Sequence, residues 1–174
     1  MAIRGIDFTT LSLKDALDLA ILIEDEAQER YEEFAAQMDQ HRTPDAAKFF
    51  RYMVENEAKH GRELSARRVQ LFGDALTAVS RTMIYDIEAP DYDAARAFMT
   101  PRKAMEAALA SEVKAFGFFE AALPAIQDAA VRALFQELRQ EEIEHQTLVK
   151  AELAKLPKDS GLSDEDFVDE PAAQ

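Results

Sequence analysis

Apolar residues return every three or four positions along most of the chain, which is the spacing of one face of an α-helix. Four such stretches are separated by proline, glycine or short polar links. They predict an all-α protein with long helices at about 12–39, 44–72, 101–124 and 128–156. Only a short link joins the first two helices, so we expect them to be antiparallel neighbours in a four-helix bundle.

Capping residues and proline mark the ends of these helices. Ser12 is suited to cap the first helix, and Thr43 and Thr100 each precede a proline that fits the first position of a helix. Gly73 is suited to end the second helix, and Pro157 the fourth. These residues set the expected boundaries of the bundle helices.

Residues 73–100 are too many for a hairpin link and predict a crossover along the bundle, with helical pieces at about 75–85 and 91–98. We expect its large apolar side chains to pack over the side of the bundle, with a surface for a partner protein as the alternative. These side chains are Tyr85, Ile87, Tyr92 and Phe98.

The chain has 174 residues, enough for one domain with a sizeable core. We expect that domain to span residues 1–157. The remaining residues, 158–174, are rich in Asp and Glu and predict an acidic, disordered tail. A peptide that docks on a partner protein is the alternative for this tail.

The chain is strongly acidic, with 34 Asp and Glu against 20 Lys and Arg. Nucleic acid is therefore not an expected partner, because it would need a basic face. No apolar stretch approaches the roughly 20 residues that are needed to cross a bilayer. The N-terminal segment also lacks the long apolar run that is typical of a secretory signal. We expect a cytoplasmic protein that does not bind membranes.

The chain contains no cysteine. This excludes disulfides, thiolate metal sites and a catalytic thiol. Any metal must be bound by oxygen and nitrogen ligands, which favours iron or manganese, although zinc can also be bound by histidine and carboxylate.

Two Glu-x-x-His steps lie on the predicted inward faces of the second and fourth helices. Each step places a carboxylate and an imidazole on one helix face, one turn apart. A further glutamate lies about 30 residues upstream of each step, on an apolar stripe where a charged group needs a partner. This is the ligand pattern of di-iron carboxylate four-helix bundles. The predicted ligands are Glu24, Glu57, His60, Glu112, Glu142 and His145.

The first two helices resemble the last two, which predicts a pseudo-two-fold repeat. Glu24 precedes Tyr31 by seven residues, as Glu112 precedes Phe119. At 1.5 Å per residue, each of the four inward carboxylates lies roughly 18–24 Å along its helix from the link that joins its pair. All four are therefore expected near the middle of the bundle.

Charge balance explains why four carboxylates would be buried together. Alone they would be costly to bury, whereas two divalent cations would neutralise them. We expect Glu57 and Glu142 to bridge the two ions, with Glu24 and Glu112 as terminal ligands. Each histidine would supply one nitrogen, and open positions would remain for dioxygen or peroxide.

The residues around these ligands have several interpretations. Tyr31 is expected in the core, with a hydrogen bond to a ligand or a redox role as the alternative. His41 is expected on the surface. Three further glutamates are expected on solvated helix faces: Glu55, Glu141 and Glu144. For Glu141, a place beside the ligands is the alternative.

These motifs resemble the ferritin-like superfamily, with rubrerythrin-type proteins the nearest likeness and bacterioferritin the second. The matching pieces read EDEAQERYEEFA from Glu24, ENEAKHGREL around Glu57, ALASEVKAFGFFEAAL around Glu112 and QEEIEHQTL around Glu142. The resemblance covers about residues 12–155. It implies a ferritin-like four-helix bundle with a long crossover and a di-iron centre.

The chain departs from the rubrerythrin pattern at two points. Rubrerythrins usually carry a cysteine-rich rubredoxin domain that supplies electrons, so the resemblance implies that this chain needs a separate electron-donor protein. They also use an extra glutamate one turn after the third-helix ligand, where this chain has Ala115. Phe119 stands where a tyrosine is usual. These departures favour a plainer, bacterioferritin-like centre with six ligands.

The resemblance implies a non-haem di-iron oxidoreductase. Peroxide or dioxygen would oxidise two ferrous ions, either to remove peroxide under oxidative stress or as a ferroxidase, with manganese or zinc as possible substitutes for iron. We expect a homodimer. The alternatives are an iron storage or delivery protein and a di-metal oxygenase that acts on an organic substrate.

Overall fold

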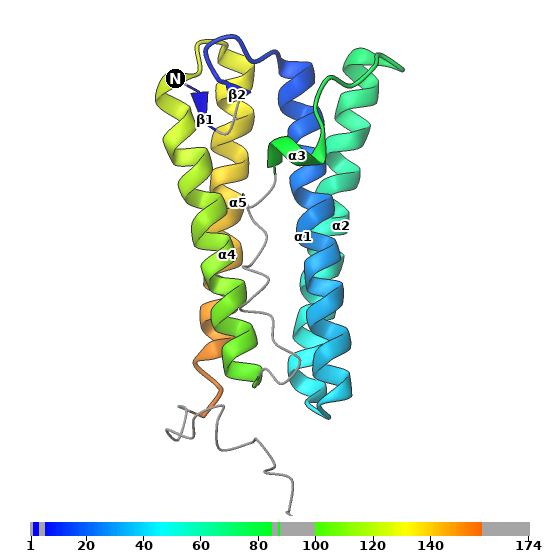
Figure 1. The fold of residues 1–174 in the computed structure, drawn as a ribbon, viewed down its shortest axis with the longest axis vertical. Coiled ribbons are helices and arrows are strands. Elements are labelled where there is room, and N and C mark those ends of the chain that lie inside the picture. Colours follow the sequence, from blue (N-terminus) through cyan, green and yellow to red (C-terminus); the bar gives the residue numbers. More distant parts are fainter. Residues whose placement is uncertain (1, 4–5, 85–86, 88–99, 158–174) are drawn as a thin grey trace, which may run out of the picture.

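The computed structural model describes residues 2–3, 6–84, 87 and 100–157. Within these residues, four long helices run along a common axis (Figure 1). They are α1 (Leu13–Gln40), α2 (Pro44–Phe72), α4 (Pro101–Ala122) and α5 (Ala129–Leu153). The predicted all-α four-helix bundle is therefore confirmed, with helix ends close to those expected from the sequence.

Side chains cap three of the four helices. The hydroxyl of Ser12 accepts a hydrogen bond from the backbone N–H of Asp15, and that of Thr100 accepts one from Lys103. The carboxylate of Asp128 caps α5 by accepting from two backbone N–H groups. Each cap satisfies N–H groups that have no partner inside the helix.

The cap predicted at Thr43 is not formed. Its hydroxyl makes no hydrogen bond to α2 and instead donates to the carbonyl of Met38, at 2.9 Å. The link to α1 is short, and Arg42 within it has a positive φ of 57°. This tight turn directs the Thr43 side chain back to the end of α1 rather than toward the first turn of α2.

The helices form two antiparallel pairs, α1 with α2 and α4 with α5 (Figure 1). Their apolar faces make two separate core clusters. One cluster, at the end of the bundle near the N-terminus, includes Phe119 and Phe135. The other, toward the opposite end, includes Phe34 and Phe50. On every long helix a short polar stretch separates the residues of the two clusters, and all six predicted ligands fall in these stretches.

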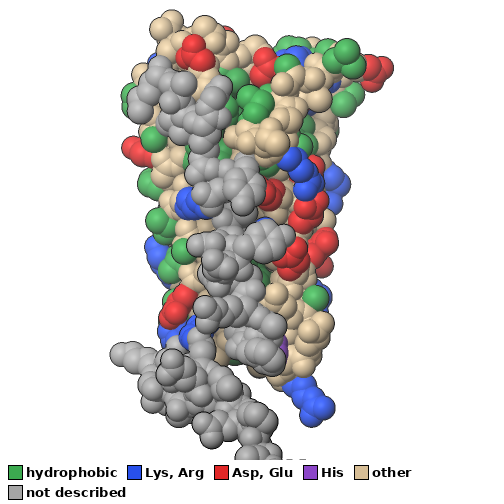
Figure 2. Space-filling model, in the orientation of Figure 1, with side chains coloured by type: hydrophobic (Ala, Val, Ile, Leu, Met, Phe, Trp, Pro, Cys, Tyr) green, Lys and Arg blue, Asp and Glu red, His purple; other side chains and the backbone are tan. Residues whose placement is uncertain are grey.

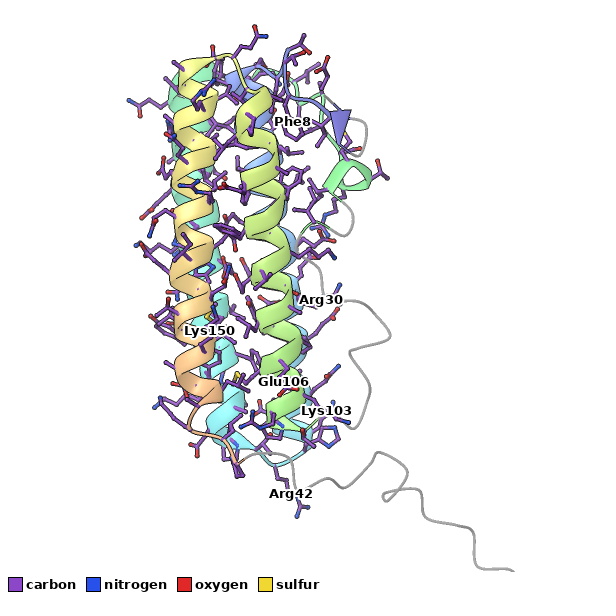
Figure 3. All side chains as sticks on the ribbon, turned by 90° about the vertical axis from the view of Figure 1, so that its left-hand side faces the viewer. Phe8, Arg30, Arg42, Lys103, Glu106 and Lys150 are labelled. Atoms are coloured by element: carbon purple, nitrogen blue, oxygen red, sulfur yellow. The ribbon has the colours of Figure 1, made fainter. Side chains whose placement is uncertain are left out.

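The segment before α1 belongs to the core, which the sequence did not predict. Strand β1 (Ala2–Ile3) pairs antiparallel with β2 (Ile6–Asp7), and the chain then places Phe8 over the end of the first cluster (Figure 3). Phe8 is 1% exposed, and its ring lies 5.7 Å from that of Phe118 and 5.8 Å from that of Phe135, centroid to centroid. The aromatic contacts explain why a short segment is held in place.

The start of the crossover is less helical than predicted. Of the piece expected at 75–85, only α3 (Arg81–Ile84) forms. The guanidinium of Arg68 donates hydrogen bonds to the carbonyls of Gly73 and Ala75, and these contacts hold the chain in a non-helical course after α2. Ile87 is buried in the first cluster, as expected.

Several predictions fall on residues outside the described ranges. They are the helical piece at 91–98, the packing of Tyr85, Tyr92 and Phe98, and the acidic tail at 158–174.

Acidic side chains gather on the α1 half of the face that carries α3 (Figure 2). Arg81 of α3 lies against this surface and donates to Glu29 of α1, at 2.7 Å. Every helix that the structure describes is too short or too polar to serve as a membrane span.

Candidate metal centre

The fold brings the six predicted ligands to one place, between the two apolar clusters. Helix α1 supplies Glu24, α4 supplies Glu112, and α2 and α5 each supply a Glu-x-x-His pair. The four glutamates are at most 6% exposed and His145 is 4% exposed, whereas His60 is half-buried. Carboxylates are seldom buried in such numbers without a counter-charge.

The first imidazole lies between carboxylates of α1 and α2. Nδ1 of His60 is 3.7 Å from Oε2 of Glu24 and 3.8 Å from Oε2 of Glu57. The Glu24 carboxylate raises the pKa of His60 above its ordinary value, although burial of the ring opposes this shift. A cation that bound here would have to displace the proton that this environment favours.

The second imidazole lies between carboxylates of α2 and α4. Nδ1 of His145 is 3.3 Å from Oε2 of Glu112 and 3.4 Å from Oε1 of Glu57. One ligand atom from each of Glu112, Glu142 and His145 falls within 4.8 Å of the others. The two imidazole rings stack with centroids 5.3 Å apart.

Glu57 therefore lies between the two imidazoles. Its Oε1 faces His145 and its Oε2 faces His60, so each oxygen points to a different nitrogen. This is the arrangement that a carboxylate needs to join two neighbouring ions. The sequence predicted a bridging role for both Glu57 and Glu142, and both roles stay predictions. The oxygens of Glu57 face both imidazoles, whereas Glu142 groups only with the His145 side.

The donor atoms fit a pair of metal ions. Nδ1 of His60, Nδ1 of His145 and Oε2 of Glu112 are buried and make no hydrogen bond within the described residues. Leaving such an atom unsatisfied costs about 1–3 kcal/mol. Two nitrogen or oxygen ligands at about 2.1 Å from one ion lie about 3.0–3.4 Å apart, which matches the distances around His145. Bound cations would thus satisfy these atoms and balance the carboxylates.

Tyr31 adds a hydrogen bond to this centre. It is 3% exposed, and its hydroxyl donates to Oε1 of Glu112. The ring stacks on Phe50, with centroids 6.0 Å apart. The hydroxyl therefore bonds to Glu112 of α4 and not to Glu24, which lies on the same helix as Tyr31. Spacing along one helix could not reveal this contact between two helices.

Glu141 lies closer to the centre than its expected place on a solvated face. It is half-buried, and one ligand atom from each of Glu24, His60 and Glu141 falls within 4.8 Å of the others. Its burial raises the pKa of its carboxyl, and the nearby His60 opposes that shift. The signal in the sequence was its position one turn before His145. Glu55 and Glu144 are exposed, as expected.

The fold and these ligands define a class of protein, the di-metal carboxylate four-helix bundle. The rubrerythrin family model matches residues 15–153. The chain therefore belongs to the rubrerythrin family, whose members are ferritin-like bundles that bind a di-iron centre.

One solved structure supports the same fold. It is the crystal structure of an uncharacterized conserved protein from Magnetospirillum magnetotacticum MS-1, to which this chain is 29% identical, with a TM-score of 0.73. The match covers 86% of this chain and 99% of that one. No protein with a curated description matches the chain.

Proposed function

We propose that the chain is a non-haem di-iron oxidoreductase in which peroxide or dioxygen oxidises a diferrous centre. The observation that carries the proposal is the position of Glu57, which presents one oxygen to each of His60 and His145 from a buried site. A single carboxylate placed in this way can hold two ions close enough to react together with one small oxidant.

Each ion would have its own set of residues. Glu24, His60 and one oxygen of Glu57 would hold one ion. Glu112, Glu142, His145 and the other oxygen of Glu57 would hold the second, and this list completes the six predicted ligands. When bound, two ferrous ions would supply the two electrons that convert one hydrogen peroxide and two protons into two water molecules.

The residues around the ligands would control access and orientation. Tyr31 holds the carboxylate of Glu112 through its hydrogen bond. The apolar clusters above and below exclude water along the bundle axis. His60 is the most exposed of the six, so a small oxidant would approach from its side. We also propose that a separate electron-donor protein returns the centre to the ferrous state, since the chain contains no cysteine to bind an iron–sulfur electron-transfer site.

A groove between α2, α4 and α5 gives no support to the alternative of an oxygenase that acts on an organic substrate. It has a volume of about 630 Å³ and is lined by Phe49, Tyr52, Met105 and Leu148, among others. None of the candidate ligands lines it. An oxygenase would need such a space beside the metal ions, so this groove gives the alternative no support.

The test is anaerobic loading of the metal-free protein with ferrous iron, followed by separate challenge with peroxide and with dioxygen in a stopped-flow spectrometer. We expect two irons per chain, a homodimer by light scattering, and oxidation of both irons by at least one oxidant. A large hollow assembly with many irons per chain would instead indicate storage. Fewer than two irons in the wild-type protein would overturn the proposal.

A further inference from the structure

Helix geometry directs two adjacent glutamates of α5 toward opposite sides of the centre. At about 100° per residue, Glu141 and Glu142 lie on either side of the line that runs through His145. The structure agrees with this division. Glu142 groups with Glu112 of α4, whereas Glu141 groups with Glu24 of α1 and His60 of α2.

In the structure the six predicted ligands are divided unequally between the two sides, because Glu142 groups with the His145 side and not with the His60 side. The His145 side has the carboxylates of Glu112 and Glu142, an imidazole and one oxygen of Glu57. The His60 side has only one terminal carboxylate beside its imidazole and the second Glu57 oxygen. A second terminal carboxylate on the His60 side would make the two donor sets equal.

We propose that Glu141 is this missing ligand and binds the ion on the His60 side. The inference rests on the proposed function, because it needs the pair of ions. Glu141 is half-buried, and one of its oxygens is within 4.8 Å of ligand atoms of both Glu24 and His60. In the repeat, the matching position before Glu57 is Asn56, a neutral residue, so α2 offers no charged counterpart.

A fifth carboxylate also changes the charge of the centre. Five carboxylates carry a total charge of −5. Its magnitude lies between the charge of two divalent ions, +4, and that of two trivalent ions, +6. With four carboxylates the centre would pass from neutral to +2 on oxidation, and with five it passes from −1 to +1. Glu141 therefore keeps the charge of the buried centre small in both states, which limits the cost of burial.

The experiment is calorimetric titration of the metal-free full chain with Co²⁺, in the wild type, in Glu141→Gln and in Glu144→Gln. The Glu144 variant is the matched control, because it removes the same charge from an exposed position of the same helix. We expect two Co²⁺ per wild-type chain. Glu141→Gln should weaken one binding event by at least about tenfold and leave the other unchanged, and Glu144→Gln should alter neither.

If Glu141→Gln bound both ions as tightly as the wild type does, the inference would be overturned and the proposed function would stand. Equal weakening of both events would also overturn it, because that pattern indicates a general charge effect. Failure of the wild type to bind two ions would overturn the proposed function as well. Unfolding of each metal-free variant, followed by circular dichroism, separates ligand loss from misfolding. If Glu141→Gln misfolds, Glu141→Asp keeps the charge while it moves the carboxylate, and should weaken the same single event.

Discussion

The hydroxyl of Tyr31 in α1 donates a hydrogen bond to Oε1 of Glu112 in α4, while Oε2 of the same carboxylate lies 3.3 Å from Nδ1 of His145. One carboxylate thus contacts a helix of the other antiparallel pair through one oxygen and the candidate metal centre through the other. The contact makes Tyr31 a residue that orients a candidate ligand as well as part of the second apolar cluster.

Tyr31→Phe removes only the hydroxyl and leaves Oε1 of Glu112 buried without this donor. We expect the free energy of unfolding of the metal-free protein to fall by about 1–3 kcal/mol and the affinity for metal to fall by about 10- to 100-fold. Urea unfolding and Co²⁺ titration measure the two effects. Tyr52→Phe is the control, because Tyr52 is 46% exposed. Equal behaviour of the two variants would rule out the positioning role.

Glu57→Gln should abolish binding of the second ion. Glutamine keeps the shape of the side chain but replaces one of the two carboxylate oxygens with an amide nitrogen that cannot bind a cation. The number of irons per chain, measured after anaerobic loading and desalting, should fall from two to one or fewer. Glu55→Gln changes an exposed residue of the same helix and should retain both irons. Two irons in both variants would show that Glu57 does not join the ions.

Metal should stabilise the folded protein, because it binds a site that the unfolded chain does not hold together. At a free concentration of about 100 times its dissociation constant, an ion at one site adds about 2.7 kcal/mol to the free energy of unfolding. Thermal unfolding with and without Mn²⁺ measures this gain. The shift should be smaller in Glu57→Gln, and a shift of the same size there would place the stabilising ion elsewhere.

Asp18→Asn should lower stability near neutral pH. Nε of Arg68 donates to Asp18 at 2.7 Å and Nζ of Lys14 donates to it at 3.0 Å. Burial tends to raise the pKa of Asp18, but these hydrogen bonds outweigh burial and hold it below its ordinary value. The ion pairs of Asp18 therefore stabilise the folded protein above about pH 3.9, the ordinary pKa of an aspartate. This stabilisation is lost as the pH falls through the lower pKa that Asp18 has in the folded state.

The difference in urea midpoint between wild type and Asp18→Asn should accordingly be large at pH 7 and shrink as the pH falls below about 4. Asp39→Asn is the matched control, because Asp39 pairs with Arg51 at 2.7 Å in an exposed position. Exposed pairs contribute little, so this variant should unfold like the wild type. A difference for Asp18→Asn that stayed constant with pH would argue against the ion pair as its cause.

Phe8→Ala should lower the free energy of unfolding by about 3–5 kcal/mol, since it removes a fully buried ring from the first apolar cluster. The iron count should stay at two, because Phe8 covers the end of the bundle and not its middle (Figure 3). Leu76→Ala truncates a side chain that is 90% exposed and should have little effect. Chemical unfolding compares the three proteins, and a stable Phe8→Ala would mean that the N-terminal segment does not contribute to the core.

The sequence by itself determined the four helices, their apolar faces and the level of the four inward carboxylates. These features follow from the 3.6-residue period and the rise of the helix, which are local properties of the chain. Glu24, Glu57, Glu112 and Glu142 could therefore be placed near the middle of a bundle before any contact between helices was known. The caps at Ser12 and Thr100 were likewise local and are present.

Contacts between helices needed the tertiary structure, because they depend on how each helix is rotated against its neighbours. The structure decided that the two oxygens of Glu57 face different imidazoles, that Tyr31 reaches Glu112, and that Glu141 lies beside His60. Apart from that of Glu57 with His60, residues far apart along the chain make these contacts, and no period within one helix encodes them. The burial of Phe8 was hidden for the same reason, since its partners Phe118 and Phe135 lie more than 100 residues away in the chain.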